Sequence, residues 1–242
     1  GSDGGEGIAI DASGNVFITG FFTGTGAFGT TNLTSSGSQD ICVAKLDTNG
    51  NWQWASRAGG SSDDEGLDIT VGSSGFIYVT GYFKNTSSFG TTNLTSYGDT
   101  DVFLGVLGAM GTWATALKAG GIGTDIGYGL IRDNSGNLYL TGSFSGSAIF
   151  GSFILISNGS NDIFLAKFNS AGSLVGAVQA GGSGNDYSTD VGVDNSGNVF
   201  ITGCFSGTAT FGPVIMTSSG STDIFVARVN PDGYLTGVVA AG

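Results

Sequence analysis

Residues 7–20 read Gly-Ile-Ala-Ile-Asp-Ala-Ser-Gly-Asn-Val-Phe-Ile-Thr-Gly, and this stretch decides the fold. A short apolar run leads into the turn Ala12-Ser13-Gly14, and a run rich in β-branched and aromatic residues follows it. Glycine supplies the positive φ that a tight turn requires, and β-branched and aromatic side chains favour strands. The stretch therefore predicts two antiparallel strands joined by a short turn.

The same stretch recurs three more times at constant spacing. Its closing Thr-Gly pair ends at Gly20, Gly81, Gly142 and Gly203, in steps of 61 residues. An aspartate followed by an apolar residue recurs with the same spacing of 61 residues, at Asp40, Asp101, Asp162 and Asp223. A fixed period without insertions indicates that every copy is one structural unit. We expect one domain over residues 1–242, with repeats at about 1–60, 61–121, 122–182 and 183–242.

Each repeat predicts four strands and no helix. In the first repeat the strand-like runs are 7–11, 15–22, 40–47 and 51–58, each next to a turn that contains glycine. The polar segment 23–39 predicts an additional short strand or hairpin. No apolar period of 3.6 residues is sustained, so we expect almost no helix.

The strand interiors are apolar at consecutive positions, as in Val16-Phe17-Ile18 and Ile41-Cys42-Val43. A sheet with one wet face would alternate apolar and polar residues instead. We therefore expect both faces of each sheet to be buried by neighbouring sheets. Because neither end repeat is polar enough to act as a cap, the pattern favours a closed ring. The predicted fold is an all-β propeller with four blades of four antiparallel strands, one blade per 61-residue repeat.

The composition excludes several classes of function. The chain has 7 Lys and Arg against 19 Asp and Glu, a net charge of −12, 46 glycines and no histidine. This acidic balance argues against nucleic acid and anionic membranes as partners, and no apolar run is long enough for a membrane helix. The lack of histidine removes the commonest general base and zinc ligand. We expect a chain that is not an enzyme, in which Cys42 and Cys204 are free thiols.

The repeat unit, with its Asp-Ile-Cys-Val-Ala-Lys-Leu-Asp strand and closing Ala-Gly-Gly, resembles the bacterial β-propeller repeat known as SBBP and, more distantly, the NHL repeat. The resemblance extends over all four copies. It implies that residues 8–10, 69–71, 130–132 and 191–193 line a central channel. It also implies an extracellular or cell-surface location in bacteria, because such repeats occur mostly in secreted or surface-attached proteins. The family implies no single activity.

One group of equivalent acids precedes the strand that this resemblance places on the channel. Its members are Asp3, Asp64, Asp125 and Asp186. Four carboxylates around one channel mouth would repel one another, and a divalent cation such as calcium would relieve the repulsion. The alternative is that each Asp caps its own turn by accepting backbone N–H groups. No cofactor is otherwise expected. Asp68 and Asp190 add charge to the same zone and are predicted ligand contacts.

Arg132 is the sharpest break in the repeat, because its equivalents Ile10, Val71 and Val193 are all apolar. A charge at this position needs an anion, water or a carboxylate beside it. It is predicted to contact a ligand, or alternatively to neutralise the acidic mouth.

Three tryptophans, Trp52, Trp54 and Trp113, lie on the last strands of the first two repeats. Grouped aromatic side chains form surfaces that stack on sugars or bind partner proteins. The alternative is that they fill space between blades.

These features favour a non-catalytic, secreted or cell-surface binding or scaffold module, expected to be a monomer, with a carbohydrate or a surface protein as its partner. A purely structural and even engineered repeat scaffold, or a spacer of a larger surface protein, is the first alternative. A metal-dependent propeller enzyme that uses axial carboxylates is the second.

Overall fold

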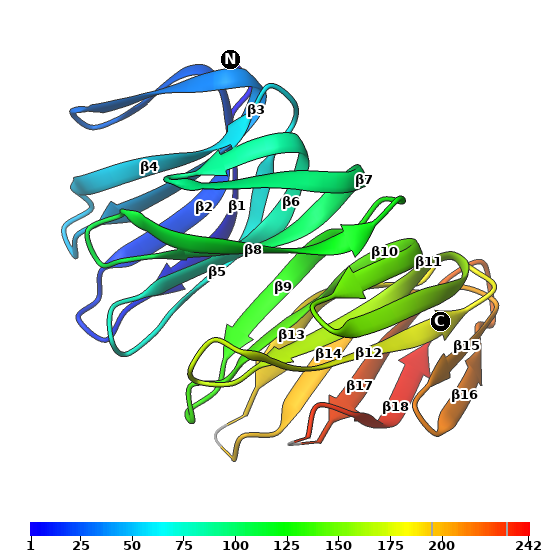
Figure 1. Cartoon of the computed structure of the whole chain (residues 1–242). Helices are drawn as coiled ribbons and strands as arrows, with labels where there is room; N and C mark the ends of the chain where they lie inside the picture. Colours follow the sequence, from blue (N-terminus) through cyan, green and yellow to red (C-terminus); the bar gives the residue numbers. More distant parts are fainter. Residues whose placement is uncertain (195, 231) are drawn as a thin grey trace. The chain divides into compact units, whose positions relative to one another are not determined.

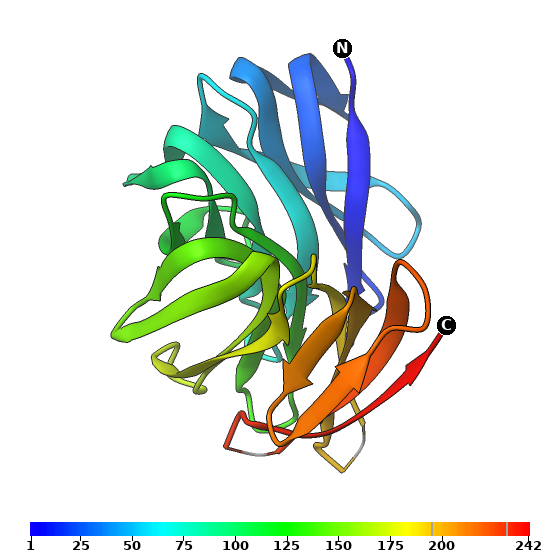
Figure 2. The same cartoon turned by 90° about the vertical axis from the view of Figure 1, so that its right-hand side faces the viewer.

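The computed structural model describes residues 1–194, 196–230 and 232–242, and every regular element in them is a β-strand (Figure 1 and Figure 2). The prediction of an all-β chain without helices is confirmed for these residues. The same residues therefore include no helix of the length and hydrophobicity that a membrane crossing needs. The chain divides into two compact units, Gly1–Lys118 and Ala119–Gly242, and each is described by itself. The prediction of a single domain stays a prediction.

The first unit contains two antiparallel sheets of four strands, one for each of the first two repeats. Neighbours in sequence pair in the orders β1-β2-β3-β4 and β5-β6-β7-β8. The strands are β1 (Gly4–Ile10), β2 (Val16–Phe28), β3 (Thr31–Leu46), β4 (Trp52–Gly60), β5 (Glu65–Val71), β6 (Ile77–Phe89), β7 (Thr92–Leu107) and β8 (Trp113–Gly121).

The second unit repeats this design. Its strands pair in the orders β9-β10-β11-β12 and β13-β14-β17-β18, and a separate β15-β16 hairpin belongs to the fourth repeat. The strands are β9 (Ile126–Arg132), β10 (Leu138–Phe150), β11 (Phe153–Phe168), β12 (Leu174–Gly182), β13 (Tyr187–Val193), β14 (Val199–Phe205), β15 (Thr208–Phe211), β16 (Val214–Thr217), β17 (Asp223–Val229) and β18 (Leu235–Ala241).

The predicted extra hairpin in segment 23–39 is a continuation of the second and third strands. β2 runs on to Phe28 and β3 begins at Thr31, with a register shift between Thr23 and Thr25. Gly24 lies inside this shift at a φ of 66°, a conformation that glycine adopts without strain. The strand bounds predicted from sequence were therefore too short on this side of the sheet.

The hairpin arms connect consecutive repeats through the backbone. In the first unit, Gly59 and Gly60 at the end of β4 pair with Ser88 and Ser87 of the next repeat's arm. Gly181 and Gly182 pair with the β15 arm in the same way in the second unit. Each arm thus extends the sheet of the repeat before it.

The side chains of each sheet lie on two opposite faces. In repeat 1 we call the face with Ile8 and Ile18 the front face, and in the other repeats the front face carries the residues at the equivalent positions, in steps of 61. The back face is the opposite one, with Phe17, Ile41 and Val43 or their equivalents. Both faces are rich in apolar side chains in all four repeats.

The core of each unit is a back face packed on a front face. In the first unit, the back face of repeat 1 packs on Ile69, Val79 and Phe103 of the front face of repeat 2. In the second unit, the back face of repeat 3 packs on the front face of repeat 4. The residues of this second core include Tyr139, Ile163 and Leu165 on one side and Val191, Ile201 and Phe225 on the other.

The prediction that both faces of every sheet are buried stays a prediction for the front face of the first repeat and the back face of the fourth, neither of which is covered within its own unit. Ile8 on the front face of repeat 1 is 66% exposed, whereas the equivalent Ile69 is 3% exposed. Ile224 on the back face of repeat 4 is 58% exposed, whereas the equivalent Ile163 is 1% exposed. The residue types match, so composition alone could not reveal the difference. Closure of the repeats into a ring stays a prediction.

Candidate functional site

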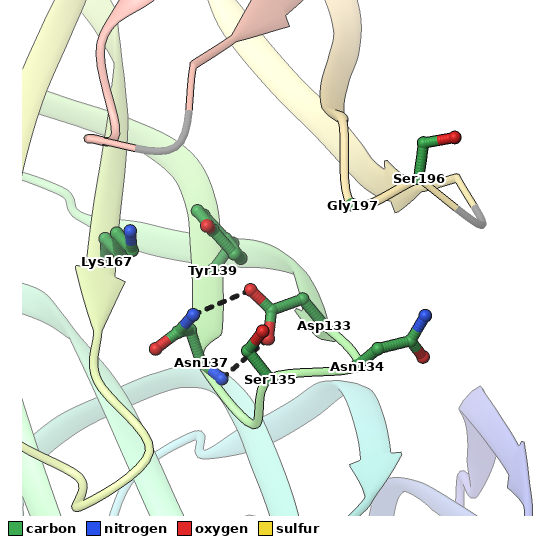
Figure 3. A pocket seen from close by; sticks show the side chains of 8 residues that line it. All are labelled: Asp133, Asn134, Ser135, Asn137, Tyr139, Lys167, Ser196 and Gly197. Carbon is green, nitrogen blue, oxygen red and sulfur yellow. Dashed lines mark hydrogen bonds between the residues drawn. The ribbon is translucent and has the colours of Figure 1, made fainter.

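A pocket of about 400 Å³ lies in the second unit, where the turn between β9 and β10 approaches the turn between β13 and β14 (Figure 3). Polar side chains dominate its lining. The lining residues are Asp133, Asn134, Ser135, Asn137, Tyr139, Lys167, Ser196 and Gly197.

The first wall of the pocket is a turn held by Asp133. Its carboxylate accepts hydrogen bonds from the backbone N–H and the side-chain amide of Asn137, both at 2.8 Å. The N–H of Gly136 donates to the carbonyl of Asp133 at 3.0 Å, and Gly136 itself has a φ of 88°. An Asp that bonds to nearby backbone N–H groups is the standard way to fix such a turn. The wall is therefore fixed by the local sequence.

Tyr139 and Lys167 form the floor of the pocket. Tyr139 is buried on the back face of repeat 3, and the Nζ of Lys167 lies 5.5 Å from the centre of its ring. Burial raises the pKa of the Tyr139 hydroxyl, and the neighbouring charge of Asp133 and a hydrogen bond to it raise it further. The hydroxyl is therefore a proton donor at neutral pH.

The sequence did not predict this pocket, because the individual residues that form it recur in other repeats. The Asp133–Asn137 turn has a counterpart at residues 11–15, and Lys45 lies over Phe17 just as Lys167 lies over Tyr139. Tyr139 gave only a weak local signal, because repeats 1 and 4 have Phe at this position but repeat 2 also has Tyr, at Tyr78. The approach of two turns from successive repeats is a tertiary feature.

Asp64, one of the four predicted metal ligands, is fully buried and uses both carboxylate oxygens within the protein. One oxygen accepts from the N–H of Gly60 at 2.7 Å, and the other accepts from the N–H of Lys84 at 3.0 Å and the hydroxyl of Ser87 at 2.7 Å. Burial raises its pKa to about 6. Asp64 thus connects the end of one repeat to the arm of the next.

The equivalent acids are held in a similar way. The partners are Gly121 and Ser145 for Asp125, at 2.7 and 3.2 Å, and Gly182 and Ser206 for Asp186, at 2.8 and 2.9 Å. Asp3 is exposed and accepts from the N–H of Thr23 at 3.0 Å. The acids thus accept backbone N–H groups, as the cap alternative expected, but the donors include residues about 20 positions away and not only those of the acid's own turn. No group of three or more Cys, Asp or Glu side chains suited to a metal lies together in the described part of the chain, and the divalent cation stays a prediction.

Asp68 and Asp190 lie at register shifts in β5 and β13. Each carboxylate accepts the N–H of the residue that follows it, Ile69 or Val191, at 2.7 Å. The structure therefore assigns both acids a local backbone contact, and their role in ligand binding stays a prediction.

Arg132 ends β9, directly before the pocket turn. Its guanidinium lies against Gly136, where a Cβ would come within 2.5 Å of Nη2. Its Nε is buried and makes no hydrogen bond to the described residues. Arg132 thus packs on the turn that forms the pocket wall, and direct ligand contact stays a prediction.

The three tryptophans do not form one surface. Trp113 is 7% exposed, belongs to the core of the first unit and donates from Nε1 to the carbonyl of Arg57 at 2.8 Å. Trp54 packs against the same core and donates to the carbonyl of Ala109 at 3.2 Å. Trp113 and Trp54 therefore fill space between sheets, as the alternative interpretation of the tryptophans expected.

Trp52 differs from the other two because it lies on the open front face of repeat 1. Its ring meets Phe28 edge-on, with centroids 5.3 Å apart, and it is 37% exposed. Trp52 and Phe28 line a shallow groove of about 270 Å³ together with Ile18, Phe22 and Cys42.

A second group of acids, equivalent to Asp40, anchors the hairpin arms. Each accepts the N–H of the residue four positions earlier at 3.0–3.1 Å through Oδ2. Their Oδ1 atoms are buried and have no hydrogen-bond partner among the described residues. In the first repeat the carboxylate of Asp40 also binds Arg57 at 2.7 Å.

Comparison with known proteins supports a propeller-like repeat protein. A scan against protein-family models finds no match. An uncharacterized WD repeat-containing protein of Acanthamoeba polyphaga mimivirus is 26% identical over 227 residues, which cover 78% of this chain and 16% of the viral protein. The chain therefore spans much less than two thirds of that relative. WD repeats are four-stranded propeller blades, and this chain likewise repeats a four-stranded antiparallel sheet, so it is similar to propeller-type repeat proteins at this coarse level.

Proposed function

We propose that the chain is a non-catalytic binding module in which β-propeller blades of the SBBP type hold a polar pocket for a small polyhydroxylated ligand such as a sugar. The secreted or cell-surface setting, with a carbohydrate as partner, belongs to the same proposal. The similarity to a WD repeat-containing protein supports the scaffold, and the pocket of the second unit supports the binding role.

The observation that carries the proposal is the variety of polar groups at one opening. Asp133 supplies acceptors, Lys167 supplies a cationic donor, and Ser135 and Ser196 supply hydroxyls that act as both. A polyhydroxylated ligand needs such a mixture of donors and acceptors at close range. A few convergent polar groups in a concave site are the usual mark of small-molecule binding.

The same groups favour binding over catalysis. Both oxygens of the Asp133 carboxylate accept a hydrogen bond from Asn137, and the raised pKa of Tyr139 keeps its hydroxyl protonated. Tyr139 is thus not prepared to act as a general base at neutral pH. The chain also has no histidine.

The test is a titration with glucose, galactose and N-acetylglucosamine, followed by NMR chemical shifts. Lys167→Ala is expected to weaken binding about tenfold, because one charge-assisted hydrogen bond contributes about 1.5 kcal/mol or more. Lys45→Ala is the matched control, since Lys45 lies over Phe17 at the same repeat position but lines no part of this pocket.

Equal weakening by both variants would show that the pocket is not the binding site. If none of the three sugars shifts resonances of the pocket residues, the spacer alternative would be favoured instead. Tyr139→Phe separates a hydroxyl contact from packing, because Phe occupies this position in repeats 1 and 4.

A further inference from the structure

The chain contains two Asn-Gly pairs, Asn49-Gly50 and Asn158-Gly159, and the structure holds them differently. An asparagine before a glycine is prone to spontaneous deamidation, because glycine has no Cβ to keep its backbone nitrogen away from the asparagine side chain. The first pair lies in the turn 47–51 between β3 and β4, and the second lies inside β11. The contacts around each pair decide which of them can react.

The turn 47–51 leaves the side chain of Asn49 without a restraint. The backbone N–H groups of Asn49 and Asn51 both donate to Oδ1 of Asp47 at 2.9 Å. The side-chain amide of Asn49 is exposed and makes no hydrogen bond to the residues that the structure describes. Gly50 has a φ of 81°, and a Cβ there would meet no atom within 4 Å. The amide of Asn49 therefore has open space in which to rotate toward Gly50.

The side chain of Asn158 is held in place instead. Its backbone N–H and its side-chain amide donate to the same oxygen of Asp162, Oδ2, at 3.1 and 3.2 Å. Gly159 lies against the end of β12, where a Cβ would come within 2.5 Å of the carbonyl oxygen of Gly182. Bringing the nitrogen of Gly159 to the side chain of Asn158 would break these contacts, which requires local unfolding.

We propose that the turn 47–51 is a site of spontaneous covalent modification, whereas the fold protects the second pair. The backbone nitrogen of Gly50 loses its proton and attacks Cγ of Asn49, and the side-chain nitrogen leaves as ammonia. Water then opens either carbonyl of the resulting cyclic succinimide, which gives aspartate or isoaspartate at position 49. The reaction consumes only water, and it adds one negative charge to a chain whose net charge is −12.

The isoaspartate product changes the turn itself, because the main chain then passes through the Cβ of residue 49 and is longer by one atom. The N–H of Asp47 donates to the carbonyl of Asn51 at 2.9 Å, and the N–H of Gly50 donates to the carbonyl of Asp47 at 3.0 Å. A longer main chain cannot keep both hydrogen bonds in this geometry. We expect the modified chain to unfold at a lower urea concentration than the fresh chain.

A second turn of the same form, between β11 and β12, provides a matched test of the geometry. The N–H groups of Ala171 and Ser173 donate to Oδ1 of Asn169 at 3.1 and 3.0 Å. Gly172 has a φ of 81°, and a Cβ there would also meet no atom within 4 Å. Ala171→Asn therefore places an asparagine before a glycine in the geometry of Asn49.

The experiment keeps the full chain at mildly alkaline pH and follows deamidation by mass spectrometry of proteolytic peptides. In the folded chain we expect Asn49 to deamidate at least about tenfold faster than Asn158, because Asn158 reacts only after local opening. In guanidinium chloride both sites are expected to react at similar rates. Ala171→Asn should gain a reactive site in the folded chain, and Asn49→Gln should lose the original one. Far-ultraviolet circular dichroism verifies that both variants are folded.

Three results would each overturn the proposal. Equal rates at Asn49 and Asn158 in the folded chain would mean that the fold does not distinguish the two pairs. An Asn49 that stays intact in the folded chain but reacts in guanidinium chloride would mean that the turn protects it. A folded Ala171→Asn chain without the additional modification would mean that the turn geometry is not the cause.

Discussion

Asp64 and Asp101 are both buried acids with a pKa raised to about 6 by burial, yet their surroundings differ. Asp64 accepts hydrogen bonds at both oxygens, from two backbone N–H groups and one hydroxyl. Asp101 has a partner for one oxygen, the N–H of Tyr97, and for the other it has none among the residues that the structure describes. The first acid joins two repeats, whereas the second holds a single turn.

Replacing Asp64 by alanine is expected to lower the free energy of unfolding by about 2–4 kcal/mol, because three donors lose their buried acceptor. Asp3→Ala is the matched control from repeat 1, where the carboxylate is exposed, and its loss should stay below about 1 kcal/mol. Urea denaturation at pH 7 measures both values. Equal losses would contradict a role for Asp64 in connecting repeats.

The raised pKa values also predict how stability depends on pH. The folded chain holds the proton of Asp101 with a pKa of about 6, whereas the reference value is 3.8. Between these two pH values the folded state binds more protons, so raising the pH favours unfolding. We expect the free energy of unfolding to fall as the pH rises from about 4 to about 6. Asp101→Asn should make the free energy of unfolding depend less on pH, and urea midpoints measured across this range test it. The same pH dependence in Asp101→Asn as in the unmodified chain would show that Asp101 is not the group responsible.

At the scale of elements, the end of each outer strand depends on a glycine. Gly59 has a φ of 142°, and a Cβ there would lie 2.7 Å from the Cγ of Asp40. Gly59→Ala is therefore expected to cost about 1–3 kcal/mol through backbone strain and a clash with the buried carboxylate. Thermal unfolding measures the change. Gly237→Ala in β18 is the control, since a Cβ there meets no atom within 4 Å. A comparable loss of stability in Gly237→Ala would contradict a specific role for Gly59.

The sequence predicted best the strands that lie next to a tight turn containing glycine. The runs 7–11 and 51–58 overlap β1 and β4, which lie beside the turns at Gly14 and Gly50. The hairpin arms were placed too short, because their exposed residues, such as Thr25 and Thr34, carry no apolar pattern and are held by backbone pairing. The pocket at Asp133 was not predicted, because it depends on how one turn approaches the next.

At the scale of the whole molecule, one packing rule explains both cores. Equivalent positions fill the core of each unit, with the back face of one repeat against the front face of the next. The front face of repeat 1 and the back face of repeat 4 have the same apolar residue types as these packed faces, but no repeat of their own unit covers them.

The two native cysteines differ in their accessibility to thiol reagents. Cys204 is a free, half-buried thiol on the back face of repeat 4, where it pairs in register with Ile224. Cys42 is buried, and burial raises its pKa to about 11, so it reacts slowly. A maleimide should therefore label Cys204 first.

The decisive measurement for the binding role is an NMR titration of the unmodified chain, Lys167→Ala and Lys45→Ala with the same sugar. We predict that resonances of the pocket residues shift in the unmodified chain and in Lys45→Ala, and that Lys167→Ala binds about tenfold more weakly. No shift at the pocket, or equal weakening by the two variants, would contradict the proposed binding site.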